Sequence, residues 1–367
     1  MFDFIVIGAG VSGASVAYSL KQRGRRVMVI ERSKIASGGS GAAGAFLSPK
    51  ICSCSKYSDF INEAFLFSSS FYRENFSSFL RDEGILRILK SEEDIEKCKK
   101  SEISSLEFSF LQQKDIDFLK RGVAPFGAYF FPQGSLIDSK GVINAMLKDI
   151  EVVESLHVKS IIKTENGYSV EGYEAKGVIV CTGSEIFEEF EYIELKSIFG
   201  HRVDIKTKTE IPYHMHKECS ISASKEGIVH VGATHIPGYR FQGSQNHDKE
   251  LDLMLQKAKS YVDFDGFEIK KVHYGTRSST FDFFPVVGEL IDNRATLEKY
   301  PYIRKGSKVP QEKFIYHKNL FIHTGHGARG FVLAPFTAEK LCDFIQNKAH
   351  IEHKISPVRL FLKYYRK

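Results

Sequence analysis

Three glycines and one acidic residue near the start of the chain have the types and spacing needed to hold a dinucleotide. Gly8, Gly10 and Gly13 form the pattern G-x-G-x-x-G, and Glu31 follows Gly13 by 18 residues. The first glycine permits a tight turn, the second lets the backbone approach a pyrophosphate, and the third allows a helix to pack closely on a strand. The free N–H groups at the start of that helix favour phosphate, and Glu31 would accept hydrogen bonds from ribose hydroxyls. The pattern predicts a dinucleotide site.

A run of small residues follows Glu31 and reads ASGGSGAAGAFLSP over residues 36–49. One interpretation is a flexible linker, because Gly/Ser-rich segments have few side chains to bury and lose much entropy on ordering. The alternative is a cradle in which small side chains let a ligand lie against backbone amides. The position of the run, directly after a dinucleotide-binding unit, favours the cradle.

The elements around these residues form a complete strand–turn–helix–strand unit. Residues 4–8 are a short apolar run typical of a strand that is buried on both faces. Ala17 and Leu20 lie at helical spacing, Gly24 ends that helix, and residues 25–31 form the second strand. A doubly wound α/β domain begins in this way.

The rest of the chain mixes helices and strands. In chain order we expect a long amphipathic helix over 56–84, a helix over 136–150 capped by Asp138, short strands over 152–183, further strands over 195–235, a helix over 247–262, a structured loop over 272–289, and a strand, glycine loop and helix over 319–346. The charged segment 90–100 is expected to be a solvated surface helix.

Composition and charge limit the class of protein. The chain has 367 residues, of which 43% are hydrophobic and 13% aromatic, enough for two packed domains. Its net charge of +6 is compatible with an anionic partner without establishing one. No apolar run is long enough to cross a membrane, and no signal peptide is present. The six cysteines form no C-x-x-C pair, so we expect no metal site and reduced thiols in a cytoplasmic protein.

Taken together, the motifs resemble those of the D-amino-acid/glycine oxidase family of FAD enzymes. Besides the N-terminal glycines and Glu31, the shared motifs are SGGSGAAGAF over 37–46, VCTG over 180–183 and GHGARGF over 325–331. They occur in the family's order and span nearly the whole chain. The resemblance implies an α/β fold with a Rossmann-like FAD-binding domain and a mixed, largely antiparallel β-sheet substrate domain. The FAD-binding domain would comprise residues 1–84, 136–190 and 315–367, and the substrate domain residues 85–135 and 191–314.

The resemblance also implies which residues bind FAD. They would lie in the first glycine turn, after the second strand, in the small-residue run, in the middle strands and in the late glycine loop. They are Gly8, Gly10, Val11, Ser12, Gly13, Glu31, Arg32, Ser40, Gly41, Ala42, Ala43, Gly44, Ala45, Val158, Thr182, Gly183, Gly325, Gly327, Ala328, Arg329, Gly330 and Phe331. The helix over 332–346 would point its positive end at the flavin ring and stabilise the anionic reduced flavin.

Three residues are expected to act in catalysis. Arg277 occupies the position where glycine oxidases place the arginine that binds the substrate carboxylate, with a fold-stabilising or surface role as the alternative. Arg329 would serve the flavin or the substrate, or only order its loop. His326, between two glycines, would tune the flavin or the proton of the substrate amine, with a structural role as the alternative. Weaker candidates near the site are His201, His230, His235, His323, Tyr239, Arg240 and Tyr274.

A closer resemblance within the family is to the oxidase half of the bifunctional tRNA-modifying proteins called MnmC. It is carried by R-x-x-x-x-D-x-x-P-x-V-G over 277–288 and GARGF-x-x-AP over 327–335. It implies removal of the carboxymethyl group, as glyoxylate, from 5-carboxymethylaminomethyl(-2-thio)uridine at the tRNA wobble position, which leaves 5-aminomethyl(-2-thio)uridine. Because the flavoprotein motif starts at residue 4, we expect any methylation of this product to fall to a separate methyltransferase.

Two other functions share parts of this pattern. An FAD-dependent oxidase or dehydrogenase of a free small amino acid, such as glycine, sarcosine or a D-amino acid, would carry every flavin motif. A flavin- or nucleotide-binding module without enzymatic activity is the other. If tRNA is the substrate, the basic C-terminal segment would contact its phosphates, whereas a solvated terminal helix is the alternative. The basic residues of that segment are Lys354, Arg359, Lys363, Arg366 and Lys367.

Overall fold

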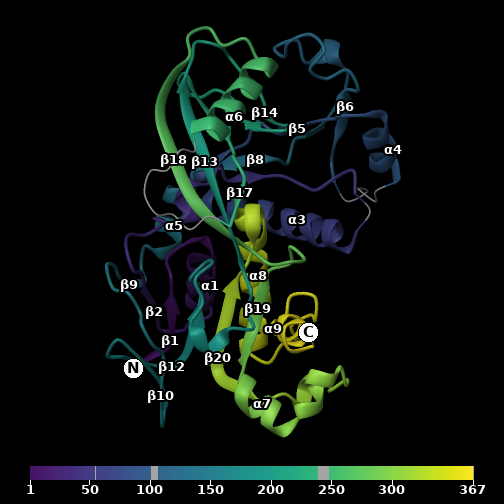
Figure 1. Cartoon of the computed structure of the whole chain (residues 1–367). Helices are drawn as coiled ribbons and strands as arrows, with labels where there is room; N and C mark the ends of the chain where they lie inside the picture. Colours follow the sequence, from purple (N-terminus) through teal and green to yellow (C-terminus); the bar gives the residue numbers. More distant parts are fainter. Residues whose placement is uncertain (54, 101–105, 239–247, 367) are drawn as a thin grey trace. The chain divides into compact units, whose positions relative to one another are not determined.

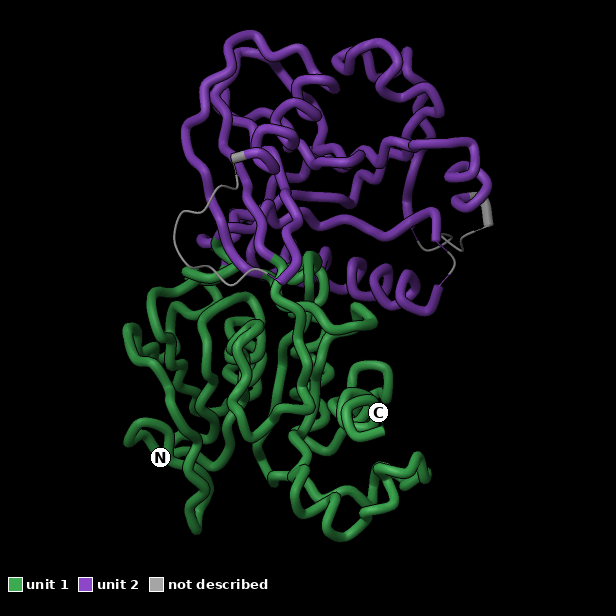
Figure 2. Tube along the Cα trace, viewed as in Figure 1, with its two compact units in different colours: residues 1–41, 143–198, 277–367 green, residues 42–142, 199–276 purple. Residues whose placement is uncertain are grey.

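The strand–turn–helix–strand unit expected at the N-terminus is present in the computed structural model as β1 (Phe2–Ile7), α1 (Val11–Gln22) and β2 (Val27–Ile30) (Figure 1). The structure describes the chain except for residues 54, 101–105, 239–247 and 367. The described chain divides into two units (Figure 2). Unit 1 contains residues 1–41, 143–198 and 277–367, and unit 2 contains residues 42–142 and 199–276.

Unit 1 is built on an eight-stranded sheet whose central strands are parallel. The central strands are β20 (Tyr316–Thr324), β12 (Tyr173–Val180), β1, β2 and β9 (Glu151–Val153), in that spatial order. Antiparallel strands β11 (Gly167–Val170) and β10 (Ile162–Thr164) extend the sheet beyond β12, and β19 (Val286–Ile291) pairs antiparallel with β20. All four residues of β2 are buried, as expected for a strand covered on both faces.

Helices cover this sheet and close its core. α1 packs on α8 (Gly330–Ile345), and Arg23 of α1 forms an ion pair with Glu339 of α8 at 2.7 Å. Ile5, Met28 and Phe361 belong to one apolar cluster of buried side chains. The remaining helices of this unit are α7 (Asn293–Lys299), α9 (Pro357–Tyr365), most of α5 (Ser139–Leu147) and the 3₁₀ turns η3 (Glu188–Phe190), η4 (Pro301–Lys305), η5 (Gln311–Lys313) and η6 (Gly327–Arg329).

Unit 2 is built on a nine-stranded, mostly antiparallel sheet. Its order is β17 (Ile236–Pro237), β13 (Lys196–Lys206), β16 (Ile228–Gly232), β15 (Ser220–Ile221), β14 (His214–His216), β5 (Ile85–Ile88), β7 (Ala128–Phe131) and β6 (Ser109–Leu111), with β18 (Glu268–Ser279) also paired to β13. β14 and β5 pair in parallel. The strands β13 and β18 each begin or end in unit 1.

A small second sheet and three helices complete unit 2. The sheet contains β3 (Phe46–Leu47), β8 (Ser135–Ile137) and β4 (Leu80–Arg81), all paired antiparallel. The helices are α3 (Lys56–Phe76), α4 (Glu92–Lys100) and α6 (Asp248–Tyr261), and η1 (Ser77–Phe79) and η2 (Gln113–Asp115) are 3₁₀ turns. Met254 and Ala258 of α6 share a buried apolar cluster with Val203 and Val229 of the large sheet.

The expected fold class is confirmed, while three expected elements are wrong in extent. The helix expected over 56–84 ends at Phe76, because the chain then turns and pairs as β4 with β8. The loop expected over 272–289 is largely strand, since β18 runs to Ser279 and β19 starts at Val286. The helix expected over 136–150 is shorter than predicted, and Asp138 accepts a hydrogen bond from the N–H of Gly141 at its start.

The compact units also divide the chain at different residues from the predicted cofactor and substrate domains. Residues 42–84 and 136–142 belong to unit 2, and residues 191–198 and 277–314 belong to unit 1. The expectation of reduced thiols is wrong for one pair, because Cys52 and Cys98 form a disulfide. Cys181, Cys219 and Cys342 are free and buried. Within the described residues, no helix is both long and apolar enough to span a bilayer.

Candidate functional site

The turn between β1 and α1 leaves no space for side chains at its glycines. Gly8 has a φ of +107°, and a Cβ there would lie 2.6 Å from the carbonyl oxygen of Cys181. A Cβ on Gly13 would lie 1.9 Å from the carbonyl oxygen of Gly8, so only hydrogen fits where α1 crosses the strand. A Cβ on Gly10 would lie 3.0 Å from the hydroxyl oxygen of Ser40. Because these glycines have no side chains, the backbone stays accessible where a pyrophosphate would approach.

The N-terminus of α1 lies at the carboxyl ends of the parallel strands, where doubly wound folds bind their ligands. The helix begins at Val11, and its N-cap residue Gly10 has no side chain with which to cap it. The Val11 N–H donates to the hydroxyl oxygen of Ser40 at 3.0 Å. The first turn contains no acidic residue, so its positive end is available to an anion. Ser40 lies in α2 (Gly39–Ala42).

Glu31 fixes the end of β2 to the glycine turn. Its side chain is buried, and its two oxygens accept hydrogen bonds from the N–H groups of Ala9 at 2.8 Å and Ser33 at 3.0 Å. An ionised carboxylate has about four acceptor positions, so these two bonds leave capacity for ribose hydroxyls. The sequence motif predicted the contact with ribose, whereas it did not predict the hydrogen bonds from Ala9 and Ser33.

The segment after β9 lies against the residues that follow β2. The N–H of Leu156 donates to the carbonyl of Glu31 at 3.0 Å, and the N–H of Ser155 donates to the carbonyl of Ser33 at 2.9 Å. This brings the region of Val158 to the same edge of the sheet, with the Val158 side chain in the apolar core.

The exit from β12 is tied both to β20 and to the residue after Glu31. Thr324, the last residue of β20, donates its hydroxyl to the carbonyl of Gly183 at 2.7 Å. Arg32 forms an ion pair with Glu185, whose carbonyl accepts the hydroxyl of Thr182. These predicted cofactor residues therefore lie at adjacent strand ends in unit 1.

Ser12 and His326 join the first glycine turn to the late glycine loop. The hydroxyl oxygen of Ser12 lies 3.0 Å from Nδ1 of His326, and Nε2 of His326 lies 3.1 Å from the hydroxyl oxygen of Thr337 in α8. The same hydroxyl lies 2.8 Å from Nε2 of the buried His323. Gly330, at the start of α8, lies against Val11. A polar chain thus connects the starts of α1 and α8.

His326 lies in a buried network of polar contacts. Its side chain is buried, both ring nitrogens are engaged, and burial lowers its pKa to about 3. A group with that pKa stays neutral near pH 7, which favours the structural role. Its expected role in tuning the flavin or the proton of the substrate amine stays a prediction.

Arg277 lies on the part of β18 that approaches the late glycine loop. Two residues further along, Ser279 forms an antiparallel bridge with His326. The Arg277 side chain is partly buried, and its burial lowers its pKa. Arg329 ends η6 and is the N-cap residue of α8, beside the glycines of that loop.

Residues 42–45 lie in unit 2 and follow a constrained backbone path. Ala45 has a φ of +49°, and its carbonyl accepts the N–H of Ile137 at 3.0 Å. A Cβ on Gly44 would lie 2.8 Å from the ring of Phe46. Arg202 of β13 donates from Nη1 to the carbonyl oxygen of Ala43 at 2.6 Å. The run is held by hydrogen bonds, unlike a flexible linker.

The weaker candidates are distributed over several environments. His201 is buried and its Nδ1 lies 2.9 Å from the hydroxyl oxygen of Thr234. His230 bonds to Asp204, and Tyr274 is 52% exposed. Tyr239 and Arg240 lie outside the described residues.

The expected basic C-terminal surface is wrong at Arg359. Arg359 is buried and forms an ion pair with Asp282 at 2.9 Å while also donating to the carbonyl of Phe284. Lys363 lies over the ring of Phe281, and Arg366 donates to the carbonyl of Ser307. Lys363 and Arg366 are nevertheless exposed, so their contact with phosphates stays a prediction, and Lys367 lies outside the described residues.

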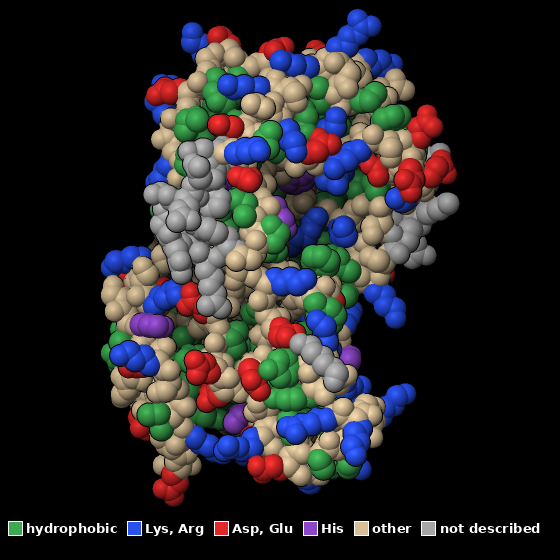
Figure 3. Space-filling view, viewed as in Figure 1, with side chains coloured by type: hydrophobic (Ala, Val, Ile, Leu, Met, Phe, Trp, Pro, Cys, Tyr) green, Lys and Arg blue, Asp and Glu red, His purple; other side chains and the backbone are tan. Residues whose placement is uncertain are grey.

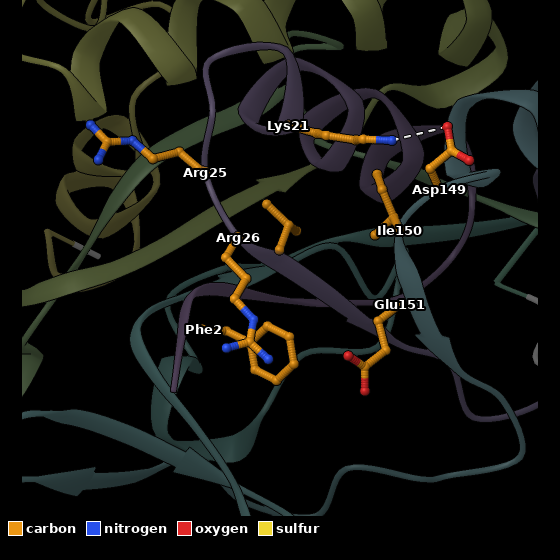
Figure 4. Close-up of a pocket in the computed structure, with 8 residues that line it drawn as sticks. Phe2, Lys21, Arg25, Arg26, Asp149, Ile150 and Glu151 are labelled. Atoms are coloured by element: carbon orange, nitrogen blue, oxygen red, sulfur yellow. Dashed lines mark ion pairs between the residues drawn. The ribbon is translucent and has the colours of Figure 1, made fainter.

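Charge on the face drawn in Figure 3 is mixed, with Lys and Arg side chains interspersed with Asp and Glu. A hollow of about 250 Å³ lies elsewhere in unit 1, near the starts of β1 and β2 and the end of α1 (Figure 4). There Lys21 pairs with Asp149 at 3.1 Å, and Arg26 lies over the ring of Phe2. Because ligands of doubly wound folds bind at the carboxyl ends of strands, this hollow is separate from the candidate site.

The residues of unit 1 fit a dinucleotide cofactor. The bare glycine backbone, the free positive end of α1 and the buried Glu31 supply the surfaces for a pyrophosphate and a ribose. The sequence did not indicate Thr337, which contacts His326 in the late glycine loop, or Arg202, which bonds to Ala43 in the small-residue run. Neither belongs to a recognisable motif, so only the folded chain reveals them.

Comparisons with known proteins agree with this fit. The family model described as FAD dependent oxidoreductase matches residues 3–344. The tRNA 5-methylaminomethyl-2-thiouridine biosynthesis bifunctional protein MnmC of Legionella pneumophila is 26% identical over 98% of this chain and 57% of its own length. That of Campylobacter concisus is 23% identical over 93% and 55%. The chain thus spans little more than half of these relatives. The crystal structure of glycine oxidase from Geobacillus kaustophilus has a TM-score of 0.76 at 19% identity, covering 95% of both chains.

Proposed function

Because the chain belongs to the FAD-dependent oxidoreductase family, whose enzymes act on C–N bonds with FAD, we propose that it oxidises a carboxymethylamino group on the wobble uridine of tRNA. The products would be 5-aminomethyl(-2-thio)uridine and glyoxylate. The observation that carries this proposal is the similarity to MnmC proteins over 98% of the chain. The substrate, a tRNA partner, a cytoplasmic location and a separate methyltransferase are all parts of the proposal.

The reaction removes two electrons and two protons from the glycine-like part of the substrate. FAD, when bound, would supply the acceptor for the hydride that leaves the methylene carbon next to the amine. The resulting imine takes up water and divides into a primary amine on the uridine and glyoxylate. The atoms balance without a nucleophile from the protein.

The protein's task would be to bind and orient the two partners. Arg277 would hold the substrate carboxylate by paired hydrogen bonds, which its partial burial strengthens by excluding water. The start of α1 would hold the pyrophosphate, and Glu31 the ribose. The N-terminus of α8 would place its positive end beside negative charge on the flavin. The contact between Ser12 and His326 would hold the starts of α1 and α8 in fixed positions relative to each other.

A free small amino acid is the second candidate substrate. The similarity to glycine oxidase, which covers 95% of this chain, favours it as far as the fold is concerned. Glycine and sarcosine present the same carboxylate and amine to Arg277 as the tRNA substituent does. The two candidates differ in the group attached to the amine.

One experiment separates them. The purified protein is loaded with FAD and incubated with tRNA from cells that lack this activity, and the nucleosides are analysed by mass spectrometry. Loss of the carboxymethylaminomethyl nucleoside with formation of the aminomethyl nucleoside and glyoxylate supports the proposal. Unchanged tRNA together with rapid bleaching of the flavin by glycine or sarcosine contradicts it and favours the amino-acid oxidase. Failure to reduce the flavin with any of these amines favours a binding module.

A further inference from the structure

A cluster of charged and polar side chains around Asp204 lies in unit 2 and takes no part in the function proposed above. One carboxylate oxygen of Asp204 lies 2.6 Å from Nδ1 of His230 and 3.3 Å from Nε of Arg202. The other lies 2.8 Å from Nε2 of His273. These four side chains are between 12% and 21% exposed.

Strand register builds the cluster. Arg202 and Asp204 are two residues apart in β13 and therefore project from the same face, while Val203 and Ile205 face the apolar cluster under α6. The antiparallel pairing with β16 places His230 directly opposite Asp204. His273 comes from β18, which pairs with β13 on its other side. Three strands thus place their polar residues around a single carboxylate.

The carboxylate is held ionised. Burial alone would raise the pKa of Asp204, but the hydrogen bond from His230 and the charge of Arg202 outweigh it and hold the pKa well below its usual range. Burial likewise lowers the pKa of His273, while Asp204 opposes that shift. Buried ion pairs add little net stability compared with apolar residues of similar size, so stability alone does not account for the cluster.

The cluster has one contact with the small-residue run, through Arg202. Its Nη1 donates to the carbonyl oxygen of Ala43 at 2.6 Å, a short, charge-assisted bond. Ala43 directly precedes Gly44 and the left-handed Ala45, so this bond fixes the chain where its path is most constrained. Arg202 is itself held by Asp204, and Asp204 by the two histidines.

We propose that Arg202 is a positioning residue for the flavin-lining segment 42–45, and that Asp204, His230 and His273 orient it for that task. The inference rests on the proposed cofactor contacts of this segment. It does not depend on which amine is the substrate. Loss of the Arg202 guanidinium would free the Ala43 carbonyl and let the segment shift, which weakens FAD binding without removing any group that contacts the substrate.

A second cluster in the same unit provides a matched control. Nε of Arg81 lies 3.2 Å from the Glu83 carboxylate, and Nε2 of the buried His214 lies 3.0 Å from the other oxygen of Glu83. Arg81 donates to the carbonyl of Ala223 at 2.7 Å. The Arg81 side chain is 11% exposed and that of Arg202 is 13% exposed. The control arginine therefore matches Arg202 in burial and bonding but bonds to a different backbone segment.

The test measures FAD affinity by titrating the apoprotein and following flavin fluorescence, together with the visible spectrum of the bound flavin. Losing a hydrogen bond to a charged group predicts that Arg202→Met binds FAD about 10- to 100-fold more weakly and shifts the flavin absorption bands. Arg202→Lys should recover part of the affinity, and Asp204→Asn should weaken binding less than Arg202→Met. Arg81→Met should bind FAD within about twofold of the parent protein.

Two outcomes overturn the inference. One is an Arg202→Met protein that is folded by circular dichroism and binds FAD as the parent does, with an unchanged spectrum. The other is equal loss of FAD affinity in Arg202→Met and Arg81→Met, which indicates general destabilisation. Should Arg202→Met fail to fold, Arg202→Lys and Asp204→Asn decide by the same readouts. An unreactive tRNA would contradict the proposed function and leave this result standing.

Discussion

The hydroxyl oxygen of Ser12 lies 3.0 Å from Nδ1 of His326, although 314 residues separate them in the chain. The contact joins the first turn of α1 to the loop before α8, the two places where a helix N-terminus faces the candidate cofactor site. Together with the packing of Gly330 on Val11, this hydrogen bond fixes the two glycine-rich segments of unit 1 relative to each other.

Buried neutral histidines beside this contact predict a loss of stability in acid. Burial lowers the pKa of His326 to about 3, far below its value near 6.5 in the unfolded chain. Between pH 6.5 and pH 3 this imidazole binds a proton in the unfolded state but not in the folded state. The free energy of unfolding therefore falls as the pH falls toward 3. The expected slope is roughly 1.4 kcal/mol per pH unit for this residue.

Urea unfolding of the apoprotein at pH 7.5 and pH 5.0 checks this slope. His326→Gln should lose less stability than the parent protein between these two pH values, because it has no imidazole to protonate. Equal pH dependence in both proteins would show that the His326 imidazole binds a proton as readily in the folded state as in the unfolded state.

Gly13→Ala should abolish FAD binding. A Cβ at this position would lie 1.9 Å from the carbonyl oxygen of Gly8, so α1 must move away from β1 and the phosphate-facing turn must open. The flavin content of the purified protein and its thermal midpoint should both fall. Gly38→Ala is the control, since a Cβ there meets nothing within 4 Å. Retention of flavin by Gly13→Ala would contradict the proposed role of the turn.

Arg277→Met should raise the KM for carboxylate substrates by about 10- to 100-fold, the usual effect of losing a hydrogen bond to a charged group. Flavin content should stay near that of the parent protein. Steady-state kinetics with the active amine and with its carboxamide analogue check this. The parent protein should discriminate strongly between them, and the variant should not. Equal discrimination by both proteins would show that Arg277 does not bind the carboxylate.

Arg359→Met should destabilise unit 1 while leaving tRNA affinity unchanged at a temperature where the variant is folded. The Arg359 guanidinium is buried against Asp282, so its removal leaves a carboxylate that has lost its ion pair. We expect a loss of about 3 kcal/mol, the lower end for buried pairs, because Asp282 is 25% exposed.

Arg366→Met serves as the control for that measurement. Its guanidinium is exposed and bonds only to the carbonyl of Ser307 among the contacts described, so the change in unfolding free energy should stay within about 0.5 kcal/mol. A filter-binding assay measures the tRNA affinity of both variants. A much larger loss of tRNA affinity in Arg359→Met than in Arg366→Met would contradict a purely structural role for Arg359.

The sequence sufficed wherever local pattern determines structure. The first strand, its glycine turn and the following helix could be read from apolar runs and glycine spacing, because all three lie within about 30 residues. The end of α3 could not, since β4 forms only by pairing with β8 more than 50 residues later. The disulfide between Cys52 and Cys98 is likewise set by tertiary contact.

The candidate site likewise contains residues that the sequence predicted and residues that only the folded structure reveals. The glycines and Glu31 were identified because their spacing is a motif, whereas the cluster at Asp204 depends on the register of β13, β16 and β18. The role of Arg359 was misjudged because a charged residue in a short amphipathic helix predicts exposure, and only the packed α9 shows a buried ion pair. Register and burial arise from long-range pairing, which residue spacing does not encode.

The bond between Ser12 and His326 also sets the time at which the site can form during synthesis. At about 5–20 residues per second, a ribosome needs roughly 15–60 s to extend the chain from Ser12 to His326. Until then β1, α1 and β2 lack the loop, strand and helix that complete unit 1. The N-terminal glycine turn is therefore made long before the loop at His326 that completes the candidate site.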